Sequence, residues 1–150
     1  MSDPIGRSLI SVGRQKISMM DFEKIQLHKA GAVSATKEDA YWQIGFTDVA
    51  QNPATYLLVQ NAFEYTDEDR ANGMDSHYVE LNDQSLSNYG GIESVVLLSD
   101  RIYFDFTPET GELFEFQGGL GLQFELSDAD FDSFKIIAEH IFDRRLQTLS

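Results

Sequence analysis

The sequence predicts an α+β domain: a mostly antiparallel sheet of six or seven strands, one short helix, and a C-terminal amphipathic helix packed on the sheet. Three observations support this fold class. Alternating apolar and polar residues dominate positions 22–126, a two-residue connection joins two of these segments, and one long segment at 127–145 has helical periodicity. Because the strands come first and the long helix last, the order differs from the strand–helix alternation of parallel-sheet folds.

The first half of the domain contains four predicted strand regions. Alternation over 22–33 indicates one strand and its continuation, and 41–46 (YWQIGF) is the second region. After a turn at Asn52-Pro53, residues 55–62 (TYLLVQNA) are rich in β-branched and aromatic side chains, so we expect a central strand there. Residues 77–81 alternate again and form the next predicted strand, beyond a stretch of acidic residues.

The second half contains a hairpin, a short helix and a further strand. The hairpin joins 92–98 to 102–106 through a Ser-Asp connection. Thr107 as N-cap and Pro108 at the first helical position predict a helix of about two turns before the next glycine pair. Alternation without a gap over 120–126 predicts a half-buried strand.

The final helix has the clearest pattern of all. Ser127 is its predicted N-cap, and aspartates at 128, 130 and 132 crowd the first turn, where the helix dipole favours anions. Apolar residues from Phe131 to Phe142 fall at i, i+3 and i+4 spacing, so one helix face must cover a sheet. Arg144 and Arg145 are expected in the last of about five turns, where cations are favoured.

The chain consists of two regions that differ in how regularly apolar and polar residues alternate. Residues 1–20 are weakly patterned and interrupted by proline and glycine, so we expect a loosely ordered N-terminal extension there, with an edge strand over 9–12 as the alternative. Residues 21–150 are expected to form a single α+β domain, because no linker, repeat or low-complexity tract divides them.

The charge of the 150-residue chain restricts its partners. The net charge is −14, with +3 on residues 1–37 and −17 on the remainder. Such acidity excludes nucleic acid and anionic membrane surfaces as direct partners, because both require a positive footprint. With no cysteine, disulfides and thiolate metal sites are impossible. We find no signal peptide and no apolar run of about 18 residues, and therefore expect a cytoplasmic protein.

No residue pattern indicates catalysis, a cofactor or a metal. The histidines His28, His77 and His140 lack the i, i+2 or i, i+4 partners that metal ligation requires. The acidic run 67–69 does not match a calcium loop, and the glycines at 118–121 lack the lysine of a phosphate loop. We therefore expect no enzyme, no cofactor and no metal.

Two short motifs carry a family resemblance. Gly73-Met74-Asp75 precedes the strand at 77–81, and Tyr89-Gly90-Gly91-Ile92 opens the hairpin. Their order and spacing resemble the immunity protein 10 family of bacterial polymorphic toxin systems, over roughly residues 22–146. One departure is the helix after the hairpin, which is commonly longer in the family. We expect structural roles for the motif residues Gly73, Met74, Tyr89, Gly90 and Gly91. The glycines would supply positive φ or close backbone approach at strand ends, and the Tyr89 ring would pack beside the second turn.

The resemblance implies an inhibitor that binds and neutralises a cognate bacterial toxin as a stoichiometric complex, without catalysis. The acidity is consistent with a basic toxin, because opposite charges accelerate association. Candidate contacts lie in the acidic stretch, with exposed Tyr65 as an aromatic anchor; the stretch could equally be a solvated connection. The candidate toxin-binding residues are Glu64, Tyr65, Asp67, Glu68, Asp69 and Asp75.

Two other functions compete with this interpretation. A small-molecule or regulatory binding module would hold its ligand in a cleft between helix and sheet, lined by Trp42 and Tyr78. A hydrolase would need two carboxylates with strongly shifted pKa values in one cleft.

Overall fold

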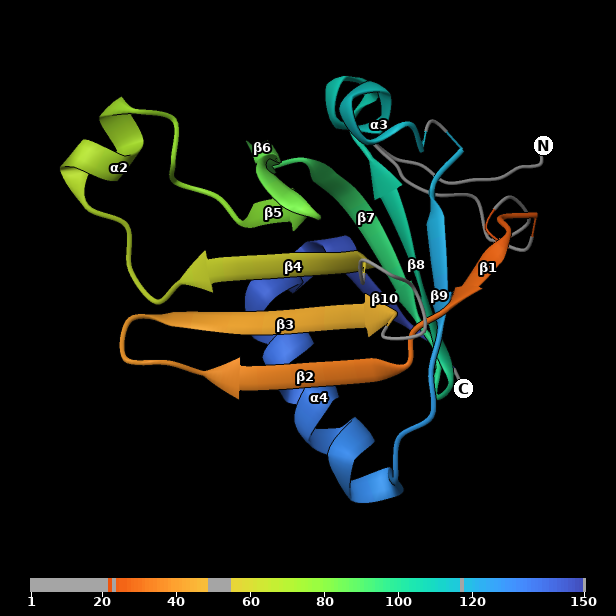
Figure 1. Ribbon diagram of the computed structural model, residues 1–150. Helices are drawn as coiled ribbons and strands as arrows, with labels where there is room; N and C mark the ends of the chain where they lie inside the picture. Colours follow the sequence, from red (N-terminus) through yellow and green to blue (C-terminus); the bar gives the residue numbers. More distant parts are fainter. Residues whose placement is uncertain (1–21, 23, 49–54, 117, 150) are drawn as a thin grey trace, which may run out of the picture.

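Two five-stranded sheets carry the fold in the computed structural model (Figure 1), which describes residues 22, 24–48, 55–116 and 118–149. The antiparallel sheet follows chain order, and its strands are β2 (Ala32–Lys37), β3 (Tyr41–Asp48), β4 (Thr55–Ala62), β5 (Tyr78–Leu81) and β6 (Asp83–Tyr89). The mixed sheet has the order β1-β9-β8-β7-β10, with β1 (Leu27–Lys29), β7 (Ile92–Leu97), β8 (Arg101–Phe106), β9 (Leu120–Gln123) and β10 (Leu146–Thr148). Its two short outer strands run parallel to their neighbours.

Helix α4 (Asp128–Phe142) covers one face of the antiparallel sheet (Figure 1). It also contacts β10 of the mixed sheet. Its apolar stripe, including Phe134 and Phe142, is buried in a core shared with both sheets. Phe46 of β3 lies at the centre of this core, with ring centroids 6.0 Å from Phe104 of β8 and 5.9 Å from Phe134 of α4. Full burial of each such ring contributes on the order of 2–3 kcal/mol.

The predicted α+β class is confirmed, with more strands than expected and with the strands divided between two sheets. Strand β4 matches the predicted 55–62, and the hairpin β7–β8 falls within a residue of its predicted bounds. Helix α3 (Pro108–Phe114) begins as predicted, because the Thr107 hydroxyl accepts a hydrogen bond from Thr110 N at 3.3 Å. Ser127 likewise caps α4 by accepting from Asp130 N at 3.1 Å.

The prediction of one strand and its continuation over residues 22–33 is wrong. Residues 22–33 were expected to form a strand and its continuation, but β1 and β2 belong to different sheets. Ala30 is buried between them, and its amide donates to Gln123 O at 2.8 Å, which anchors the chain to the mixed sheet before it turns away.

Four further elements differ from expectation. The polar strand β6, the five-residue helix α2 (Asp67–Ala71) and the three-residue strand β10 were not predicted. Arg144 and Arg145 lie beyond the end of α4, in a 3₁₀ turn (Asp143–Arg145), because Asp143 has a φ of 52° that breaks the α-helix. The expectations for residues 1–20 and for a turn at Asn52-Pro53 lie outside the described residues.

The passage from β6 to β7 carries the chain from the antiparallel sheet to the mixed sheet. Gly90 has a φ of +66°, which L side chains rarely adopt. Gly91 packs against fully buried Thr110, and a Cβ there would lie 2.5 Å from the Thr110 Oγ1 atom. That oxygen is held in place, since it accepts from Asn88 Nδ2 at 2.9 Å and contacts Thr107 Oγ1 at 3.0 Å.

The close approach at Gly91 gives a direct stability test. We expect Gly91→Ala to lower the free energy of unfolding by roughly 1–3 kcal/mol, because the added methyl overpacks a site that cannot relax. Gly118→Ala is the matched control, since nothing lies within 4 Å of its Cβ position, and its change should stay within about 0.5 kcal/mol. Urea unfolding measures both; equal effects of the two substitutions would contradict this account.

Candidate binding surface

The acidic stretch predicted as a contact surface forms an arm, residues 64–75, that extends from the end of β4 and includes α2 (Figure 1). A capping box begins its helix: the Thr66 hydroxyl accepts from Asp69 N at 3.0 Å, and the Asp69 carboxylate accepts from Thr66 N at 2.9 Å. Acids at 67, 68 and 69 all lie in the first turn, where the helix dipole stabilises them. The capping box and the favourable position of these acids explain why such an acidic segment forms a helix.

The candidate acidic residues occupy different positions on the arm. Glu64, Glu68 and Asp75 are exposed, whereas Asp69 is half-buried and committed to the cap. Asp67 pairs with Arg70 at 3.3 Å, with both side chains exposed, so this ion pair contributes little stability. The arm is therefore a solvent-facing negative surface on a locally stabilised helix.

Tyr65 differs from the exposed anchor that was expected. Its side chain is half-buried, and its hydroxyl donates a hydrogen bond to Asn61 Oδ1. Asn61 Nδ2 in turn donates to Ile141 O at 3.0 Å, near the end of α4. Burial raises the pKa of the Tyr65 hydroxyl. Tyr65 thus ties the arm to the core.

Of the family-motif residues, Gly73 and Met74 lie near the end of the arm, and Tyr89, Gly90 and Gly91 lie at the end of β6 and just after it. Gly73 has a φ of +70° just after α2, and Met74 follows, with its amide donating to Asp69 O at 2.8 Å. The ring of half-exposed Tyr89, at the end of β6, packs on Tyr78 with a centroid distance of 5.3 Å. These residues shape the path that returns the chain from the arm to the antiparallel sheet.

His77 is buried where the two sheets meet, and only 1% of its surface is exposed. Its Nε2 atom accepts a hydrogen bond from Ile92 N at 3.0 Å, and its carbonyl accepts from Gly90 N at 2.7 Å. Accepting through Nε2 requires the neutral ring. Burial, with a smaller contribution from the Arg145 charge, lowers its pKa to about 4. His77 therefore acts as a fixed structural acceptor.

One polar cluster was missed by sequence reasoning. Glu80 of β5 has only 7% of its surface exposed, yet its carboxylate lies on the face of the antiparallel sheet opposite α4. Tyr56 donates to one carboxylate oxygen, and Tyr78 donates to the other at 2.5 Å. The hydrogen bond to Glu80 is the main cause that raises the pKa of Tyr56 to about 12. The only sequence signal was Tyr78-x-Glu80 on one strand face.

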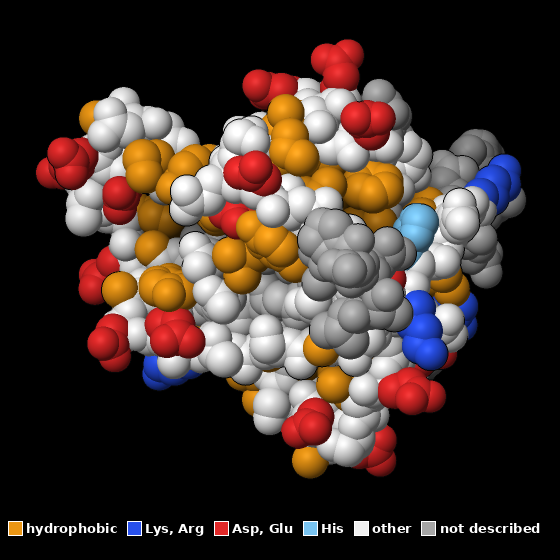
Figure 2. Space-filling view, in the orientation of Figure 1, with side chains coloured by type: hydrophobic (Ala, Val, Ile, Leu, Met, Phe, Trp, Pro, Cys, Tyr) orange, Lys and Arg blue, Asp and Glu red, His pale blue; other side chains and the backbone are white. Residues whose placement is uncertain are grey.

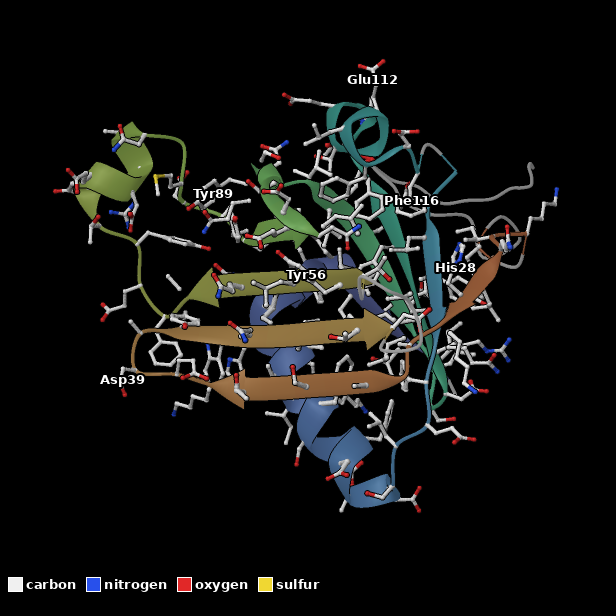
Figure 3. The ribbon with its side chains drawn as sticks, in the orientation of Figure 1. His28, Asp39, Tyr56, Tyr89, Glu112 and Phe116 are labelled. Carbon is white, nitrogen blue, oxygen red and sulfur yellow. The ribbon has the colours of Figure 1, made fainter. Side chains whose placement is uncertain are left out.

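A groove of about 250 Å³ lies between the two sheets near His28, Tyr56 and Phe116 (Figure 3). Ligand pockets usually enclose about 300–1,000 Å³, so this groove is small. The expected cleft lined by Trp42 and Tyr78 is not found among the described residues: Trp42 stacks on His140 at 4.1 Å, while Tyr78 faces away on the opposite side of the sheet.

Within the described ranges, no group of three or more His, Asp or Glu side chains is placed to hold a metal ion. No helix in the same ranges is long and apolar enough to span a membrane. The candidate binding surfaces among the described residues are the acidic arm and the adjoining face of the antiparallel sheet.

The fold and these surfaces define a two-sheet α+β domain with one sheet face left uncovered by any described helix. In a comparison with protein-family models, residues 28–132 match the family described as Immunity protein 10, over more than two thirds of the chain. The chain therefore belongs to the immunity protein 10 family, and the resemblance carried by its two short motifs is confirmed. No curated protein and no solved structure gave a significant match.

Buried His77 generates a prediction for acid stability. Its folded pKa, about 4, lies below the value of about 6.5 in unfolded chains. Between these values the unfolded state binds the proton and the folded state does not, so stability falls as the pH drops from 6.5 toward 4. By pH 5 the expected loss is about 2 kcal/mol.

The matched variant is His77→Gln, whose amide oxygen offers Ile92 N an acceptor that does not titrate. Urea unfolding of both proteins at pH 7.5 and pH 5 measures the difference. We expect the wild type to lose about 2 kcal/mol more than the variant over this interval. Parallel pH profiles would show that His77 is not buried in its neutral form.

Proposed function

We propose that this protein binds and neutralises a cognate bacterial toxin in the cytoplasm, as a stoichiometric inhibitor without catalysis. The observation that carries the proposal is the match of residues 28–132 to the immunity protein 10 family. An immunity protein works by occupying a toxin surface, so it requires a complementary binding face and no reaction chemistry.

The charge distribution supports a protein partner with a basic surface. Residues 32–89, which span the antiparallel sheet and the arm, contain ten acidic and two basic residues. A field of one sign attracts an opposite surface and increases the association rate. Such steering is valuable for an inhibitor that must bind its toxin before the toxin reaches its target.

The direct test is binding to candidate toxin domains, chosen from the products of the genes that neighbour this one. We expect a one-to-one complex in size-exclusion chromatography at micromolar concentration, and loss of toxin activity at equal molar ratio. A toxin without detectable complex formation or inhibition would overturn the proposed function.

A second prediction concerns the arm. We expect Asp67→Lys with Glu68→Lys to slow association by about tenfold at low salt and to flatten its salt dependence, because steering depends on charge near the contact. Stopped-flow measurements over a series of salt concentrations test this.

The control is Glu125→Lys with Asp128→Lys, at the opposite end of the molecule near the start of α4 (Figure 1). Both pairs change the net charge equally, and all four side chains are exposed. A smaller effect of the control assigns steering to the arm. Equal effects would attribute steering to net charge alone.

A further inference from the structure

One face of the antiparallel sheet is covered by no helix or strand of the described residues, and it is called the open face here. Its composition is unusual for so acidic a chain. Alternation places half-buried, uncharged side chains outward along β3, β4 and β5, while their neighbours enter the core. Gln60 and Gln43 confirm the shared face through a hydrogen bond of 2.7 Å. The outward residues include Tyr41, Gln43, Thr47, Tyr56, Leu58, Gln60, Ala62 and Tyr78.

Figure 2 views this face, and among the side chains coloured by type the acidic ones lie mainly at its margin and the uncharged ones over the middle strands. The composition resembles the core of a protein interface, where tyrosine is enriched and charge is depleted. The acidic arm beside this face has the sign of charge that a basic partner requires.

Glu80 is the exception within the uncharged centre. Its carboxylate has about four acceptor positions, of which the two tyrosine hydroxyls occupy two. No Lys, Arg or His of the described residues forms an ion pair with it. A carboxylate so shielded from water is costly unless it is paired, and neutral hydroxyl donors supply only part of that compensation.

The size of the open face bears on what it can bind. Strands about 4.8 Å apart and up to eight residues long span roughly 20 Å by 27 Å, which is roughly 500 Å² of projected surface. A standard interface buries about 800 Å² on each partner. The open face therefore accounts for most of one interface, and the adjacent arm supplies the remainder.

Resting on the proposed function, we propose that the toxin docks on the open face and inserts an arginine or lysine side chain against Glu80, between Tyr56 and Tyr78. The two tyrosines hold the carboxylate in position before binding, so little ordering is lost when the cation arrives. The acidic arm steers the approach, and Glu80 supplies the central contact of the complex.

The experiment compares toxin-domain affinity across three variants of the full chain. Glu80→Gln removes the charge and keeps the shape. Leu58→Lys places a cation directly opposite Glu80 in the strand register, so that the carboxylate is paired internally and the face is blocked. Glu93→Gln removes an exposed carboxylate from β7 of the mixed sheet and serves as the control.

We expect Glu80→Gln and Leu58→Lys each to raise the dissociation constant of the complex by about 30-fold or more, as for loss of a buried charge pair. The control should remain within about twofold of the wild type. Thermal unfolding of each variant identifies any that fails to fold. Leu58→Lys, which alters only a half-buried surface position, keeps the test decisive if Glu80→Gln does not fold.

The outcomes separate this inference from the proposed function. If the wild type does not bind the toxin, the proposed function fails and the docking site fails with it. If the wild type binds and folded Glu80→Gln and Leu58→Lys bind equally well, the toxin uses another surface, and only the docking site is overturned.

Discussion

The junction between the two sheets is the constraint on which the rest of the structure depends. At this point the chain must leave one sheet and enter the other without losing its backbone hydrogen bonds. The imidazole of His77 accepts from Ile92 N, the carbonyl of His77 accepts from Gly90 N, and the Gly91 carbonyl accepts from Thr107 N at 3.0 Å. Each buried donor is thereby satisfied in a place that regular sheet pairing cannot reach. A small residue is required at Gly91 because Thr110 of α3 and Val79 of β5 leave no room for a side chain there.

Several elements were predictable because the pattern of apolar, polar and capping residues within each one indicates its structure. Strand β4 alternates between buried and outward residues and is bounded by turns, and both α3 and α4 begin at side chains that cap them. Strand β6 was missed because its residues are polar and have low strand propensity. Its hydrogen-bonded pairing with β5 stabilises it as a strand. Strand β10 has three residues, and only its contact with β7 makes it a strand.

The candidate site was likewise predictable only where it depends on residues that are neighbours in the sequence. The acidic arm was recognisable because its charges are consecutive in sequence, although the burial of Tyr65 depends on Asn61 and the end of α4. The Glu80 cluster joins β4 to β5, with Tyr56 diagonal to Glu80 in the register. No local pattern reveals a diagonal pair, because it depends on the register of two strands separated by the arm.

The two parallel pairings of the mixed sheet affect how the chain folds. Strand β1 pairs with β9, nearly a hundred residues later, and β10 adds the last described strand beside β7. Contacts between such distant positions slow folding, because loop-closure entropy is lost before the contacts form. The mixed sheet is incomplete until residues 146–148 have been synthesised. The antiparallel sheet, whose strands all lie between residues 32 and 89, has no such requirement.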